Sequence, residues 1–348
     1  MRPRMTLLWP VPALLATLLT SVSCDRKAQT STGATSPPAA VRLGYFANLT
    51  QAQAVLGVSS GEFARVIGPS KLQTKVFNAG PSLIEALLAG EIDLGYIGPG
   101  PTLNAQAKTH GQGIRVVAAA ANNGVVIVAS EASGIKTLED LKGKRVGTPQ
   151  YGNTQDVAAR HYLKDVLHQT DLHDVRPIPN SEQSGLMSRG DLDASWAPEP
   201  WGSFLVAQNG AHVVGEEKDL WPEKQFNITV VVTTPDFLAA HRDIVEKMLR
   251  VHRNWTERLQ KDPDKYLPQL ESALFDLTQK KFPSGVLPAA MKRTQFTDDP
   301  LPQTFESFAQ WSLDLGFVQQ KPDLTNLVDT TILKKLEKEQ PSTQPGKD

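Results

Sequence analysis

The sequence predicts an α/β protein built from two similar lobes that face each other across a cleft. Short apolar runs alternate with helical patterns, one motif occurs twice, and 348 residues exceed the usual size of a single domain. The chain is 40% hydrophobic and 21% charged, which is typical of a soluble globular protein.

The predicted elements alternate between strand and helix along the first half. Ser82 and Glu85 suggest a capping box in the helix over 81–90, and Gly90 suits its C-terminal end. The other predicted strands cover 41–46, 92–97, 116–121, 125–129 and 145–148, and the other helices cover 51–67, 137–141 and 235–259.

An internal repeat relates the two halves of the chain. Residues 88–97 align with residues 188–197, and both stretches contain a glycine, an acidic residue, an apolar residue and an aspartate before a strand. Upstream of each stretch, a strand leads into a polar loop and a helix. Two such halves would place four loop-to-helix turns around one cleft. Asp93 and Asp193 are expected to serve turn or strand-edge structure.

The N-terminal residues are interpreted as an export signal. A basic start precedes a mostly apolar run over 5–19, which is shorter than the ~20 residues that a transmembrane helix needs. Ser21-Val22-Ser23-Cys24 resembles a bacterial lipobox, so residues 1–24 are predicted to be a signal peptide with Cys24 as the lipidation site. Alternatively, Cys24, the only cysteine, is lost with the signal peptide.

Both ends of the chain are predicted to lie outside the folded part. Residues 25–40 are rich in Ser, Thr, Pro, Gly and Ala, and we expect a disordered tether. Residues 337–348 are charged and without periodicity, and we expect a flexible tail.

Five segments in a fixed order resemble the aliphatic-sulfonate, taurine and nitrate branch of the periplasmic solute-binding proteins. These segments are 44–50, 90–98, 137–147, 190–194 and 199–201. The resemblance implies the type II, two-lobed (Venus flytrap) fold with mixed sheets flanked by helices. It implies a lobe I of residues 41–129 and 235–336, a lobe II of residues 130–234, and crossovers near 128–130 and 232–234.

The resemblance also implies a function. The chain would be the solute-binding protein of an ABC importer, a monomer that captures a small anionic ligand and delivers it to the permease membrane subunits. Together with the export signal, it implies a lipid-anchored protein in the periplasm or on the extracytoplasmic face of the inner membrane.

Polar residues at predicted helix starts are the candidate ligand-binding groups. Helix N-termini present unpaired N–H groups and a partial positive charge, so they can hold an anion without an arginine. The candidates are Asn48, Thr50, Gly100, Thr102, Asn153, Thr154 and Gln155. The alternative is that these residues are ordinary N-caps, worth ~1 kcal/mol each to the fold.

Two tryptophans flank a proline-rich loop that follows the second repeat. Trp196 and Trp201 could cover the organic part of a ligand, or they could pack in the core. Glu199, between them, would repel an anion, so it points away, pairs with a base, or recognises a ligand amino group. The family resemblance leaves sulfonate, taurine and nitrate-like ligands open.

Other functional classes are disfavoured. The formal net charge of −1 gives no basis for nucleic-acid binding. No nucleophile motif or metal-ligand spacing is present, so neither catalysis nor a metal or cofactor is expected. Two alternatives stay open: an enzyme of the same fold acting on a pyrimidine or chorismate-derived substrate, and a periplasmic sensor subunit.

Overall fold

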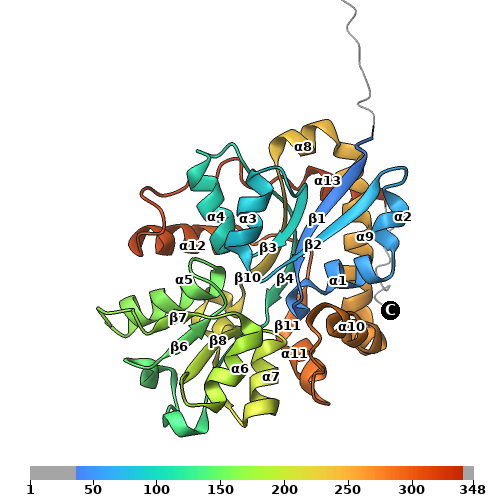
Figure 1. The fold of residues 1–348 in the computed structure, drawn as a ribbon. Helices are drawn as coiled ribbons and strands as arrows, with labels where there is room; N and C mark the ends of the chain where they lie inside the picture. Colours follow the sequence, from blue (N-terminus) through green and yellow to red (C-terminus); the bar gives the residue numbers. More distant parts are fainter. Residues whose placement is uncertain (1–36, 340–348) are drawn as a thin grey trace, which may run out of the picture. The chain divides into compact units, whose positions relative to one another are not determined.

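Two sheets, each flanked by helices, organise the part of the chain that the structure describes (Figure 1). A computed structural model describes residues 37–339. The predicted signal peptide, the lipobox with Cys24 and residues 340–348 of the tail lie outside these residues, as does most of the tether.

The first sheet is mixed and has the strand order β11-β4-β10-β3-β1-β2. β1 runs parallel to β2 and β3, whereas β10 is antiparallel to β3 and β4. Its strands are β1 (Ala40–Phe46), β2 (Lys71–Phe77), β3 (Leu94–Ile97), β4 (Arg115–Asn123), β10 (Asn227–Thr233) and β11 (Thr294–Phe296).

The second sheet is also mixed, in the order β7-β6-β8-β5-β9. β6 is parallel to β7 and β8, and β5 is antiparallel to β8 and β9. Its strands are β5 (Val125–Ala129), β6 (Val146–Thr148), β7 (Val175–Pro177), β8 (Ala194–Pro198) and β9 (His212–Glu216). The predicted fold class, mixed sheets flanked by helices, is confirmed.

The helices divide between the two sheets. Around the second sheet, in the lower part of Figure 1, lie α5 (Thr154–His161), α6 (Asn180–Ser188) and α7 (Trp201–Asn209). The remaining helices are α1 (Ala52–Ser59), α2 (Glu62–Val66), α3 (Gly80–Leu88), α4 (Pro99–Lys108), α8 (Pro235–Ala240), α9 (Arg242–Lys261), α10 (Pro263–Thr278), α11 (Val286–Arg293), α12 (Pro302–Asp314) and α13 (Thr331–Glu339). No helix within residues 37–339 is long and apolar enough to cross a membrane.

The repeated aspartates perform the same structural task in both lobes. Asp93 accepts hydrogen bonds from the backbone N–H and Nε of Arg42, at 2.8 and 3.0 Å. Asp193 accepts the corresponding bonds from Arg145, both at 2.9 Å. Asp93 therefore ties the start of β3 to Arg42 in β1, and Asp193 ties the start of β8 to Arg145, directly before β6, so both aspartates serve strand-edge structure as the sequence predicted.

The chain crosses between the sheets at other places than predicted. β4 ends at Asn123, Gly124 has a φ of 72°, and β5 then pairs along its full length with β8 in the second sheet. The crossover therefore lies at Gly124 and not near 128–130. The return crossover is the segment Glu217–Phe226 between β9 and β10, because β10 pairs within the first sheet through Thr233. The predicted position at 232–234 is wrong.

Several predicted helix boundaries also change. The helix over 235–259 is two helices, α8 and α9, because His241 between them is not helical. The helix over 51–67 is two helices, because Gly61 adopts a left-handed φ of 71° between them. The predicted capping box at Ser82 does not form, because α3 already begins at Gly80 and the Ser82 hydroxyl donates to the Ala79 carbonyl at 3.0 Å. α13 continues to Glu339, past the predicted start of the tail at 337.

A buried histidine lies in the core of the first lobe. The Tyr96 hydroxyl donates to Nδ1 of His252 at 2.8 Å, and Nε2 of His252 donates to the Ala119 carbonyl at 2.8 Å. Burial lowers the pKa of His252 to about 4, although the bond to Ala119 opposes the shift. His252 is thus a satisfied, neutral core residue.

Candidate functional site

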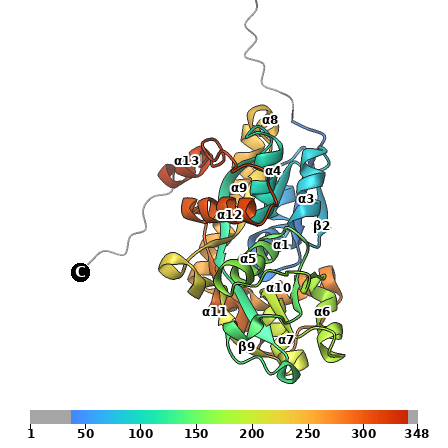
Figure 2. The same cartoon turned by 90° about the vertical axis from the view of Figure 1, so that its left-hand side faces the viewer.

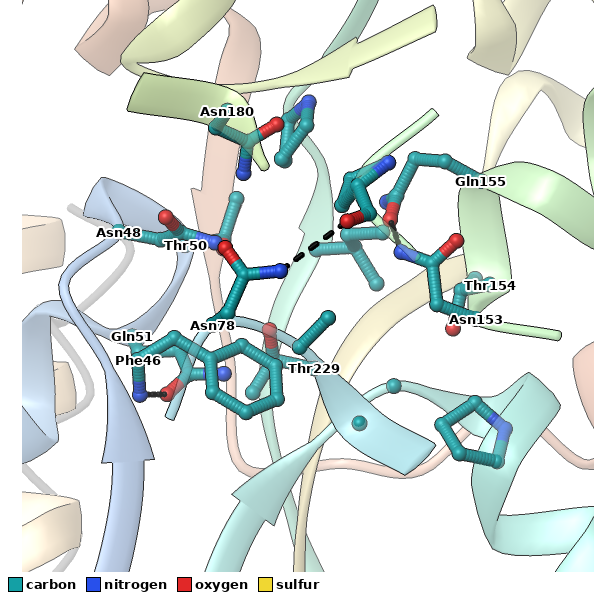
Figure 3. A pocket seen from close by; sticks show the side chains of 17 residues that line it. Phe46, Asn48, Thr50, Gln51, Asn78, Asn153, Thr154, Gln155, Asn180 and Thr229 are labelled. Atoms are coloured by element: carbon teal, nitrogen blue, oxygen red, sulfur yellow. Dashed lines mark hydrogen bonds between the residues drawn. The ribbon is translucent and has the colours of Figure 1, made fainter. Parts of the chain in front are cut away.

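A polar cleft lies where loops of the first lobe meet helix starts of the second (Figure 3). Its cavity volume is about 20 Å³. Its polar lining residues are Asn48, Thr50, Gln51, Asn78, Asn153, Thr154, Gln155, Asn180 and Thr229. None of the described residues that line the cleft has a charged side chain.

Helix starts supply backbone donors to the cleft. Gly80 begins α3, Thr154 begins α5, and Asn180 begins α6. The N–H groups of these three residues have no hydrogen-bond partner among the described residues, because the first turn of a helix lacks intrahelical acceptors. Each helix N-terminus also carries a partial positive charge.

Side-chain hydrogen bonds leave donor groups free at the cleft. The Oδ1 atom of Asn48 accepts from Trp201 Nε1 at 2.8 Å, and Oε1 of Gln155 accepts from Asn153 Nδ2 at 2.7 Å. The amide nitrogens of Asn48 and Gln155 are therefore available to a ligand. Gln51 is different, because its amide bonds the Phe46 N–H and the Tyr96 carbonyl and so serves the fold.

Asn180 is the unsatisfied group of the cleft. It is 5% exposed, and its Oδ1 atom is buried without a hydrogen-bond partner among the described residues. Its side-chain amide lies toward the cleft, across from Asn78 (Figure 3). A buried acceptor without a partner costs about 1–3 kcal/mol, so a ligand group that donates a hydrogen bond to Asn180 Oδ1 would recover that cost.

Hydrogen bonds join the two lobes around the cleft. Asn78 Nδ2 donates to the Pro149 carbonyl at 3.0 Å, and the Gly100 N–H donates to Thr154 Oγ1 at 3.3 Å. A Cβ atom on Gly98 would lie 2.0 Å from Thr154 Oγ1, so only glycine permits this approach of α4 to α5.

The structure brings five of the predicted site residues to the cleft. Figure 3 shows the first-lobe residues on one side and the second-lobe residues on the other. They are Asn48, Thr50, Asn153, Thr154 and Gln155. Asn153 also acts as an N-cap, since its Oδ1 atom accepts from the Asp156 N–H at 2.8 Å.

The predicted contribution of Gly100 and Thr102 is not found. Pro99 and Pro101 have no N–H, and the Gly100 N–H is used by Thr154. Both the N–H and the hydroxyl of Thr102 bond the Gly98 carbonyl, and the residue is fully buried. The start of α4 therefore contacts the second lobe and offers no donor to a ligand.

The two tryptophans have separate surroundings. Trp196 does not line the cleft, and its Nε1 atom instead donates to buried Glu217 at 2.6 Å. Trp201 lines a groove that adjoins the cleft and shares Asn48, Asn78 and Asn180 with it. The groove also has apolar walls, formed by Ala47, Val76, Phe77 and Leu277.

Glu199 pairs with a base that the sequence analysis did not identify. Its carboxylate is 3.0 Å from Nη1 of Arg293 and accepts the Ser203 hydroxyl at 2.9 Å. Burial raises the pKa of Glu199, and the bonds to Ser203 and Arg293 oppose this rise. Glu199 is fully buried outside the cleft lining, so of the three expected roles the pairing with a base is observed.

Among the cleft residues that sequence reasoning missed are Asn78, Gly80, Asn180 and Thr229. The first three occupy the starts of α3 and α6, which follow β2 and β7 at equivalent places in the two halves. If the alignment of the two halves had been extended to these helix starts, it would have indicated these three residues. Thr229 lies on β10, which has no counterpart in the aligned motif. Within residues 37–339, no group of His, Cys, Asp and Glu could hold a metal ion.

Solved structures define the class of this fold. The periplasmic nitrate-binding protein NrtA from Synechocystis PCC 6803 superposes with a TM-score of 0.74 at 12% identity, covering 86% of this chain and 89% of that one. The alkanesulfonate-binding protein SsuA from Xanthomonas axonopodis pv. citri, bound to MOPS, gives 0.64 at 22% identity, covering 82% and 95%. The chain therefore has the two-lobed fold of periplasmic binding proteins.

Sequence comparison then identifies the family. Residues 34–266 match the NMT1-like family, and the chain belongs to it. A protein of Escherichia coli (strain K12) that is named for binding aliphatic sulfonates is 30% identical over 187 residues, covering 54% of this chain and 58% of the relative. The taurine-binding periplasmic protein of the same organism is 23% identical over 251 residues, covering 70% and 74%. The chain thus spans little more than half the length of the first of these relatives.

Proposed function

We propose that this protein is the extracytoplasmic solute-binding component of an ABC importer. It captures a small anion in the cleft between its lobes and delivers it to a membrane permease without chemical change. The observation that carries the proposal is the cleft itself, in which several helix starts and neutral amides surround a space without charged side chains. The named functions of the relatives agree with this role.

The donors of the cleft favour an anion over a cation. Hydrogen bonds to a charged group are about twice as strong as those between neutral groups, and a site of low dielectric constant that excludes water strengthens them further. The N–H groups of Gly80 and Thr154 and the free amide nitrogen of Gln155 are such donors. A cation, in contrast, would find no carboxylate among the lining residues.

The adjoining groove favours an anion that carries an organic part. Phe77, Trp201 and Leu277 give apolar surface directly beside the polar residues of the cleft. A sulfonate such as taurine or a short alkanesulfonate would place its anionic head at the helix starts and its carbon chain toward this groove. Nitrate would fill the polar part alone.

The location and partners follow from the same proposal. Residues 1–24 would direct export, and lipidation of Cys24 would hold a monomer at the extracytoplasmic face of the inner membrane. Both features lie outside the described residues.

The test is a ligand screen on the purified protein. Thermal shift and calorimetry with taurine, alkanesulfonates, nitrate, bicarbonate, phosphonates and thiamine precursors should identify an anion that binds one to one. Mass spectrometry should recover that anion unchanged. Turnover of a bound compound, or binding of cations and no anions, would contradict the proposal.

A further inference from the structure

A second cavity, separate from the cleft, lies beside the return crossover between the two sheets. It has a volume of about 130 Å³ and shares no lining residue with the cleft. We call it the crossover cavity. Its lining consists of Tyr162, Trp196, Glu217, Trp221 and Trp311, together with Ala158, His161, Val166 and Leu220, and the His161 ring stacks on Trp311 with the centroids 4.2 Å apart. Trp221 lies within the crossover segment, and Trp311 lies on α12, which packs against α4 and α5 (Figure 2).

Aromatic rings form most of the wall of the crossover cavity. The ring centroids of Tyr162 and Trp196 are 5.8 Å apart, and those of Trp221 and Trp311 are 4.7 Å apart. The volume is comparable to the ~150 Å³ cavity in another protein that accepts benzene. A compact organic molecule of a few heavy atoms therefore fits.

One buried carboxylate faces these rings. Glu217 is 1% exposed, and its two oxygens accept from Trp196 Nε1 at 2.6 Å and from Trp221 Nε1 at 3.2 Å. Among the described residues, Glu217 has no cationic partner, since the neighbouring Lys218 pairs with Glu216. An ionised carboxylate in such surroundings is costly unless a positive charge accompanies it.

The indole N–H groups hold the carboxylate in an orientation suited to its charged form. Burial raises the pKa of Glu217 to about 7, and the two indole bonds oppose this rise. A carboxylate accepts about four hydrogen bonds, so each oxygen keeps acceptor capacity. The faces of indole rings attract cations, especially desolvated ones.

We propose that the crossover cavity binds a small organic ammonium ion. The ammonium group would pair with Glu217, and its carbon substituents would contact Tyr162, Trp221 and Trp311. The proposal does not depend on the identity of the anion in the cleft, because the two sites have no residue in common.

Nuclear magnetic resonance of the indole N–H groups tests this site directly. The whole protein is titrated with tetramethylammonium chloride, with sodium chloride at matched ionic strength, and with tert-butanol, a neutral molecule of similar shape. We expect saturable shifts of the Trp196 and Trp221 indole signals with tetramethylammonium, and affinity for tert-butanol that is weaker by about tenfold or more.

Two variants separate a binding role of Glu217 from a structural one. Glu217→Gln keeps the shape but removes the charge, and should weaken tetramethylammonium binding by about tenfold or more. Trp311→Leu leaves both indole bonds to Glu217 in place and should also weaken binding, which covers the case that Glu217→Gln does not fold. Absence of saturable shifts, equal affinity for tert-butanol, or full affinity in Trp311→Leu would overturn the proposal.

Discussion

The two lobes share a scaffold but differ in the loops through which they contact each other. Arg42 with Asp93 and Arg145 with Asp193 make the same bonds at the same place in each lobe. The loops after β3 and β8 differ: Gly98 begins a proline-rich turn that contacts the second lobe, whereas Glu199 pairs with Arg293. The duplicated aspartates therefore hold the fold, and the loops that differ determine how the lobes meet.

The lobes should differ most in how pH changes their stability. Between pH 6.5 and 4, the unfolded chain binds a proton at His252 that the folded first lobe does not bind, so stability falls as pH falls. Glu217, packed on the second sheet, has a pKa raised from 4.5 to about 7, so its contribution to stability is lost as pH rises through that interval. Each shift corresponds to about 3 kcal/mol.

Urea unfolding of His252→Gln and Glu217→Gln from pH 4 to 7 measures these contributions. Relative to the wild type, His252→Gln should gain stability toward low pH, and Glu217→Gln should gain it toward high pH. Parallel pH profiles for all three proteins would show that neither group titrates as described.

Closure of the cleft depends on a glycine in the first lobe. Gly98→Ala would place a Cβ atom 2.0 Å from Thr154 Oγ1 and keep the lobes apart, so anion affinity should fall by about 100-fold or more. Gly185→Ala is the matched control, because its Cβ atom would meet only Arg189 Nη1, at 3.5 Å. Calorimetry with the anion from the screen measures both; equal affinities would mean that this contact is not needed for binding.

The two aspartate clamps should affect stability and not binding. Asp93→Ala should lower the free energy of unfolding by about 2 kcal/mol, because it removes the acceptor for the Arg42 backbone N–H. Asp193→Ala should cost less, since the Asp193 side chain is 16% exposed and that of Asp93 7%. Asp191→Ala, at an exposed ion pair, is the control. A loss of anion affinity in either clamp variant would contradict a purely structural role.

The smallest expected effect comes from comparing one buried threonine of each lobe, Thr154 of the second and Thr102 of the first. Thr154→Ala should weaken anion binding by more than about tenfold with little change in melting temperature, since its hydroxyl lies at the cleft. Thr102→Ala, whose hydroxyl bonds only the Gly98 carbonyl, should leave affinity unchanged. Unchanged affinity in Thr154→Ala would remove this residue from the site.

Local patterns in the sequence predicted the scaffold well. The repeat predicted the roles of Asp93 and Asp193, and the apolar run over 125–129 predicted β5. The crossovers were misplaced although Asn122-Asn123-Gly124 separates β4 from β5, because membership in one sheet or the other depends on partners far along the chain.

The candidate site was predictable only where it follows from helix starts. Asn48, Thr50 and the residues at the start of α5 were predicted in this way, and they line the cleft. Gly100 was overestimated because the prediction did not count the missing N–H groups of two prolines. Trp196 could not be assigned from its position, because its partner Glu217 reaches it only through the packing of the crossover segment.

The central claim is that uncharged donors of both lobes hold a negatively charged ligand. Calorimetry of Gln155→Glu, with the exposed Gln303→Glu as a control, tests this claim most directly. A carboxylate at position 155 should weaken binding of the anion by about 100-fold or more, because like charges in a desolvated site cost several kcal/mol, while Gln303→Glu should bind as the wild type does. Equal or tighter binding by Gln155→Glu would contradict the account.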